Sequence, residues 1–137
     1  MSQESGGRLR PHPQDRFRPA QHLVDLEQAA TDLAAEGDLA HGHRQKVLYR
    51  HGPLTIALFL FEAGAGLAQH KADGVVTIHT IQGRLHVIAE GEEHDLPVGR
   101  LLVLAPGVAH DVRAETPSRV LLTVSREAAG AAPSSKD

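Results

Sequence analysis

The sequence contains no cysteine and no tryptophan, and only 3% of its residues are aromatic. Without cysteine there are no disulfides, no thiolate catalysis and no zinc–thiolate centre, so any metal would need His, Asp or Glu ligands. The scarcity of aromatic side chains argues against a surface that stacks on nucleic-acid bases. The formal net charge is -3 and the isoelectric point is near 6.3, which indicates no basic surface. We therefore expect no nucleic-acid partner.

Long apolar runs are also missing. The longest, LTIALFLF at 54–61, has the length of a strand and falls far short of the roughly 20 apolar residues of a membrane span. The N-terminus carries no apolar run of signal-peptide length. These absences predict a cytoplasmic protein with no membrane partner. The chain of 137 residues is of single-domain size and is long enough to bury a core without disulfides.

Composition divides the chain into three parts. Residues 1–21 are rich in Arg, Pro, Gly and Gln and have almost no apolar pattern, which is typical of a disordered leader. Residues 22–127 are predicted to form one domain. Residues 128–137 are predicted to be a flexible tail.

A short helix is predicted at about 25–36. Asp25 is suited to be the N-cap, and Gln28 follows three residues later as in a capping box. Gly37 stands where a C-terminal cap belongs. One side of this helix is apolar at helical spacing, through Leu26, Ala29, Ala30 and Leu33. We expect the helix to serve packing and not chemistry.

From about residue 44 onward, short strand-like segments alternate with turn residues such as Gly, Pro and Asp. This spacing predicts an all-β sandwich or barrel. In the segment at 54–61, apolar residues occupy both odd-numbered and even-numbered positions, so both faces of the strand need covering. We expect a second subunit to cover one of them, and hence a homodimer.

The segment Gly66–Ala114 resembles the two consecutive motifs of the cupin superfamily, and in particular its small single-domain bacterial members. In the first motif, His70 falls on the first histidine and Gly83 on the closing glycine. In the second motif, GRLLVLAPGVAHDVRA at 99–114 supplies the matching positions, namely Gly99, Gly107 and His110. Ala105 and Ala114 replace the proline and asparagine of the second motif.

The resemblance implies a conical, mostly antiparallel β-barrel of jelly-roll type, here with a short N-terminal helix. In metal-dependent members, three histidines and a glutamate point inward and hold one divalent metal. Ala72 and Val76 stand at two of those four positions. His70 and His110 remain as candidate ligands for one divalent metal (Zn, Mn, Fe or Ni).

His79 is a weaker candidate for a third ligand. Side chains of a strand alternate between its faces, so an inward Val76 turns His79 outward. Only a bulge near Gly74 would reverse that parity.

The resemblance also implies a cavity with apolar walls around the two histidines. Its predicted lining is His70, Val76, Ile78, Thr80, Leu102, Leu104 and His110. Apolar walls with a few convergent polar groups are typical of a ligand pocket. One hypothesis is therefore a small-molecule binding module, with or without a metal. The alternative is a metal-dependent cupin oxygenase or isomerase acting on a small polar substrate, and the third hypothesis is a pair of histidines without function. The sequence assigns no catalytic residue.

Overall fold

The computed structural model describes residues 20–36 and 42–126. Most of the predicted leader at 1–21, the predicted tail at 128–137, and Gly37 lie outside the described residues. Among the described residues, no helix is long and apolar enough to cross a membrane.

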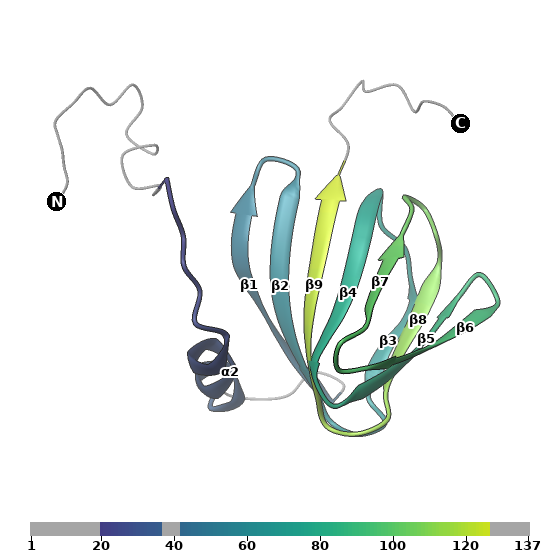
Figure 1. Ribbon diagram of the computed structural model, residues 1–137, viewed down its shortest axis with the longest axis horizontal. Helices are drawn as coiled ribbons and strands as arrows, with labels where there is room; N and C mark the ends of the chain where they lie inside the picture. The colour runs from purple at the N-terminus through teal and green to yellow at the C-terminus, as the bar shows by residue number, and fades with distance from the viewer. Residues whose placement is uncertain (1–19, 37–41, 127–137) are drawn as a thin grey trace, which may run out of the picture.

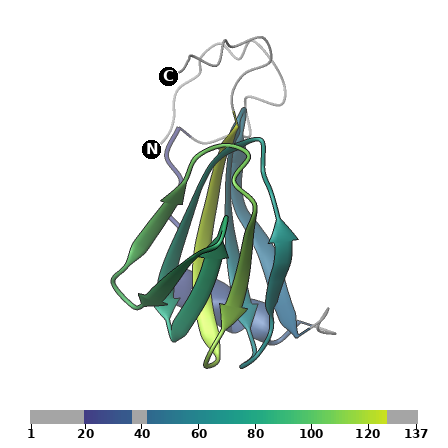
Figure 2. The ribbon, with the colours of Figure 1, turned by 90° about the vertical axis from the view of Figure 1, so that its right-hand side faces the viewer.

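The described chain forms one short helix and two antiparallel sheets, as predicted (Figure 1). The helix is α2 (Leu26–Ala34). The first sheet has the order β1 (His43–His51), β2 (Leu54–Phe61), β9 (Ser118–Arg126), β4 (Gly74–Gln82) and β7 (Leu101–Leu104). The second has the order β3 (Gly66–His70), β8 (His110–Ala114), β5 (Arg84–Ala89) and β6 (Glu92–Pro97). The two sheets lie face to face (Figure 2).

The core lies between the two sheets, and strand alternation decides which side chains enter it. In β4 the even-numbered residues from Gly74 to Thr80 are buried, while the odd-numbered residues between them are not. Ile78 of the first sheet and Leu85 and Val87 of the second are fully buried. A continuous apolar cluster results, which is the main stabilising feature of such a sandwich.

Gly83 joins β4 to β5 and has a φ of +91°. A Cβ at this position would lie 2.4 Å from Ser118 Oγ and 2.5 Å from the Pro117 carbonyl oxygen. Only glycine can adopt this positive φ without strain and also leave the space that a Cβ would occupy free. The closing glycine of the first motif is thus explained by local geometry.

Helix α2 begins at the predicted cap. The Asp25 carboxylate accepts a hydrogen bond of 3.0 Å from the Gln28 N–H, which satisfies one of the open donors of the first turn. The Gln28 side chain donates to Asp32 and so does not close a capping box. Ala35 is the C-cap.

The helix covers the outer face of β2. Ala57, Phe59 and Phe61 point into the main core, whereas Leu58 packs under Ala30 and Leu33 of α2. Leu58 is therefore covered by a helix of the same chain, and the homodimer stays a prediction.

Candidate functional site

The position of His70 depends on a bulge in β3. The pairing of β3 with β8 shifts between Leu67 and His70, and Gln69 within the shift has a φ of +50°. The N–H of Gln69 donates a hydrogen bond to the carboxylate of Asp111. The bulge brings His70 directly opposite His110 on the neighbouring strand.

The two imidazoles stack on each other. Their ring centroids are 6.0 Å apart and their planes differ by 16°. His110 is only 5% exposed, and its Nδ1 lies 3.0 Å from the carbonyl oxygen of Val108. Because a carbonyl only accepts, the bond assigns the proton to Nδ1 and leaves Nε2 of His110 available to another group.

His70 keeps an exposed surface because it faces an open cavity. Its surroundings still remove part of its hydration, and this partial burial lowers the pKa of the His70 imidazole below its usual value. Repulsion from His110 lowers the same pKa further, as the second cause. His70 is therefore neutral at neutral pH in the free protein.

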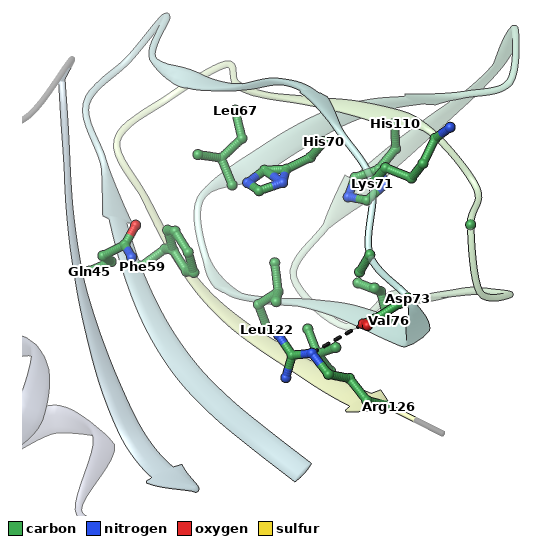
Figure 3. Close-up of a pocket in the computed structure, with 13 residues that line it drawn as sticks. Gln45, Phe59, Leu67, His70, Lys71, Asp73, Val76, His110, Leu122 and Arg126 are labelled. Carbon is green, nitrogen blue, oxygen red and sulfur yellow. Dashed lines mark ion pairs between the residues drawn. The ribbon is translucent and has the colours of Figure 1, made fainter. Parts of the chain in front are cut away.

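The two histidines belong to the wall of a cavity of about 720 Å³ between the sheets (Figure 3). His70 and His110 come from the second sheet, and they face Phe59 and Leu122 of the first sheet across the cavity. The complete lining is Gln45, Phe59, Leu67, His70, Lys71, Ala72, Asp73, Val76, Gly107, His110, Leu122, Val124 and Arg126. Six of these thirteen residues have apolar side chains, and apolar atoms form most of the exposed wall.

Charged groups are part of the cavity lining. Arg126 Nε lies 3.1 Å from Asp73 Oδ1, and Lys71 is a lining residue that lies next to His110 (Figure 3). Two cations and one carboxylate leave an excess of one positive charge. The N–H of Gly107 donates to the Ala72 carbonyl over 2.8 Å, which ties the two loops of the motifs together at the cavity wall.

Three of the predicted lining residues line this cavity, namely His70, Val76 and His110. The other four do not line it, which corrects our prediction: Ile78, Thr80 and Leu104 are buried, and Leu102 is half-buried against the core. Ile78 and Thr80 are 0% exposed, because they lie further along β4, where the sheets pack without a gap. The Thr80 hydroxyl there donates to the Leu96 carbonyl at 3.0 Å.

Sequence reasoning missed the opposite wall of the cavity. Gln45, Phe59, Leu122, Val124 and Arg126 lie on β1, β2 and β9, all outside the two motifs. The alternation in these strands shows which residues share a face. The order of the strands in the two sheets decides which strands lie across from His70. A local sequence pattern does not reveal that order.

His79 lies away from the cavity, so the weaker prediction that it is a third ligand is wrong. It is turned to the opposite face from its buried neighbours Ile78 and Thr80. The pairing of β4 with β9 is regular from Gly74 to Thr80 and shifts only beyond that point. The bulge near Gly74 that would turn His79 inward is therefore absent from this strand.

The residues of the cavity do not fit a resident divalent metal. The four positions at which the resemblance implies ligands, His70, Ala72, Val76 and His110, all line the one cavity. Only the two histidines among them carry a donor side chain, whereas protein sites for zinc and similar ions use three or four. Within residues 20–36 and 42–126, no group of three or more His, Asp or Glu residues is placed to hold an ion.

The arrangement of the strands defines a β-sandwich of the jelly-roll class with a cavity between its sheets. Solved structures identify it more closely. KdgF from Halomonas sp. matches with 26% identity and a TM-score of 0.60, over 67% of this chain and 87% of that one. An RmlC-like cupin from Desulfovibrio desulfuricans matches with 27% identity and a TM-score of 0.55, over 59% and 79%.

A cupin superfamily protein from Desulfitobacterium hafniense has the same fold at 15% identity, with a TM-score of 0.62 over 69% of this chain and 87% of that one. The described chain is therefore a small protein of the cupin superfamily, which confirms the resemblance in its sequence. No protein-family model and no curated protein matches the sequence.

Proposed function

We propose that the cavity binds a small organic anion with an apolar body, such as an aromatic or short-chain carboxylate, without a metal. The observation that carries this proposal is the stacked pair His70 and His110 in the wall of an otherwise largely apolar cavity. A pocket of about 720 Å³ is in the usual range for small-molecule sites, and apolar walls with few polar groups are their usual lining.

The polar groups of the cavity favour an anion. The neutral imidazole of His70 has one N–H that can donate a hydrogen bond to a carboxylate, and a charged acceptor makes such a bond strong. Lys71 and Arg126 add positive charge, of which Asp73 offsets one unit. Phe59, Leu122 and Val124 supply an apolar surface for the remainder of the ligand.

One observation favours the second candidate, a metal-dependent cupin enzyme. The bond from His110 Nδ1 to the Val108 carbonyl leaves Nε2 with its lone pair, and metal-binding histidines are commonly oriented by such a bond. Ala72 and Val76 offer no donor to complete a ligand set. The anion-binding module is therefore the function that the residues support best.

The test is calorimetric titration of the full chain with benzoate and hexanoate, beside benzamide and hexanamide. We expect the carboxylates to bind at least about tenfold more tightly than the amides of the same shape, because charge-assisted hydrogen bonds are the stronger ones. His70→Ala should weaken carboxylate binding by a similar factor, and His110→Ala should weaken it as well, because the His110 ring stacks on His70. The matched control is His86→Ala, since His86 lies on the second sheet between Glu93 and Glu115, outside the cavity lining.

Equal binding of acid and amide would overturn the anion proposal. So would carboxylate binding that is lost equally in all three histidine variants. No heat of binding at about 1 mM of either acid, a concentration that detects very weak complexes, would also count against it.

A further inference from the structure

The wall of the cavity that faces the two histidines carries an arginine. Arg126 is the last residue of β9 and lines the cavity. Figure 3 shows it on the first sheet, across the cavity from His70 and His110 of the second sheet. Each of the two walls therefore has a group that can donate hydrogen bonds to an anion. One is the His70 imidazole, and the other is the Arg126 guanidinium.

Two contacts fix the direction of the Arg126 guanidinium. Its Nε lies 3.1 Å from Asp73 Oδ1, and its Nη1 donates to the Thr55 hydroxyl oxygen over 3.5 Å. A guanidinium has five N–H donors, and these contacts engage two of them. The others can donate to a ligand in the cavity. A planar group whose direction is already fixed loses little freedom when it binds a carboxylate.

Asp73 offsets the charge of Arg126 only in part. The side chain of Asp73 is 79% exposed and that of Arg126 is 48% exposed. An ion pair between groups this exposed is weak, because water competes for both partners. A ligand carboxylate that is already held in the cavity can therefore share or replace this contact. With Lys71, the lining still carries one positive charge in excess.

The lining between the two walls is apolar. Leu122, Val124 and Arg126 follow each other at every second position of β9 and all line the cavity, as expected of residues on one face of a strand. Val76 of β4 lies beside Val124, and Phe59 faces His70 (Figure 3). An apolar surface with an anion-binding group at each end fits a ligand with an apolar body and two acidic ends.

We propose that the cavity prefers dicarboxylates whose two carboxylate groups are separated by an apolar chain or ring. One carboxylate accepts a hydrogen bond from the His70 imidazole, and the other accepts hydrogen bonds from the Arg126 guanidinium. This inference rests on the proposed function, because it assigns a second acidic group to the same ligand. Arg126 is then the residue that distinguishes a dicarboxylate from a monocarboxylate.

The second carboxylate gains affinity from the first. Once one end is bound near His70, the other end is confined near Arg126, where its effective concentration is far above that of a free ligand. Hydrogen bonds between a guanidinium and a carboxylate are among the strong ones, since both partners are charged. A stiff body such as a benzene ring also loses little conformational freedom on binding.

The test is calorimetric titration of the full chain at about pH 7.5, where carboxyl groups, with an ordinary pKa of about 4, are ionised. The probes are terephthalate, adipate and suberate, each beside its own monomethyl ester. The ester has the same body but lacks the second charge. We expect at least one of the three diacids to bind about tenfold more tightly than its ester, well beyond the statistical advantage of two equivalent ends.

Arg126→Gln should remove most of this preference, so that the diacid and its ester have similar dissociation constants. The loss of a positive charge weakens the binding of both ligands, so the quantity compared is the ratio of the two constants. Arg119→Gln is the matched control. Arg119 lies on the same strand and loses the same charge, but it pairs with Glu27 of α2 and is outside the cavity lining. This variant should keep the preference.

The comparison of benzoate with benzamide separates the two proposals. If benzoate binds more tightly than benzamide but no diacid binds more tightly than its ester, the dicarboxylate inference is wrong and the proposed function stands. If benzoate and benzamide bind alike, the proposed function fails and this inference fails with it.

A preference that persists in Arg126→Gln, or that disappears equally in Arg119→Gln, would also overturn the dicarboxylate inference. Circular dichroism establishes that both variants are folded. Should Arg126→Gln fail to fold, the comparison of each diacid with its ester in the wild type still decides the inference.

Discussion

At the scale of single residues, Gln69 and Asp111 decide where His70 lies. A φ of +50° at Gln69 costs a residue with a side chain about 1 kcal/mol. The hydrogen bond from its N–H to the Asp111 carboxylate offsets this cost. Asp111 therefore acts as a positioning residue for the imidazole pair, although its own side chain is turned away from His110 by strand alternation.

We expect Asp111→Ala to lower the free energy of unfolding by about 1 kcal/mol, because it removes the acceptor of the Gln69 N–H. It should also weaken carboxylate binding, since His70 is no longer held opposite His110. Urea unfolding and calorimetric titration measure the two effects. Asp111→Asn keeps an acceptor oxygen, so its stability and its carboxylate binding should both be close to those of the wild type. Wild-type stability in the alanine variant would contradict the role of the bulge.

The pKa of His70 predicts a pH dependence of stability. Partial burial and then His110 lower this pKa in the folded protein below the usual value of 6.5. As the pH falls below about 6.5, His70 becomes protonated in the unfolded chain while it stays neutral in the folded chain. The free energy of unfolding therefore decreases in that window, and the loss is complete below the lowered folded-state pKa.

The measurement is urea unfolding of the wild type and His70→Gln at pH 7.5 and 5.5, two values that bracket the titration of an unperturbed histidine (about 6.5). We expect a smaller loss of stability in the variant than in the wild type. An identical pH dependence of the two proteins would show that the neutral imidazole of His70 is not favoured by folding.

At the scale of elements, β2 and α2 form a second, smaller core. Leu33 of the helix and Leu58 of the strand are each 1% exposed and pack together with Ala30. Their burial explains why β2 is apolar at both odd-numbered and even-numbered positions. The odd-numbered residues face the main core, and the even-numbered Leu58 faces the helix.

Leu33→Ala should lower the free energy of unfolding by about 3 kcal/mol, because it leaves a cavity in this contact. Leu23→Ala is the control with the same change in side chain, since Leu23 is 99% exposed, and its effect should be within about 0.5 kcal/mol. Urea unfolding of both variants tests this. Equal effects would mean that the helix contributes little to the fold.

At the scale of the whole molecule, the donor set predicts the response to metals. Incubation with Zn²⁺, Mn²⁺, Fe²⁺ or Ni²⁺ should leave Tm unchanged, because an ion held by two imidazoles alone binds too weakly to stabilise the folded state. Thermal unfolding with and without each metal measures this, beside elemental analysis of the tag-free protein. A rise in Tm that disappears in both His70→Ala and His110→Ala would instead favour the metal-dependent alternative.

Much of the fold could be predicted from local patterns. The turn residues and strand alternation predicted an all-β sandwich, Asp25 predicted the start of the helix, and the motif glycines pointed to the cupin fold. The cavity was predicted only in part: His70, Val76 and His110 line it, whereas Ile78 and Thr80 do not. Alternation tells which face a side chain occupies, but it does not tell at what height along the strand the two sheets separate.

The sequence by itself determined the fold class, the inward direction of the even residues of β4, and the loss of two donor side chains at Ala72 and Val76. These follow from chemistry within a few residues of each position. Only the tertiary structure decided that α2 covers β2, that β1, β2 and β9 supply the opposite wall of the cavity, and that β7 is the last strand of its sheet. These depend on which distant segments meet, and that outcome is set by the packing of the whole chain.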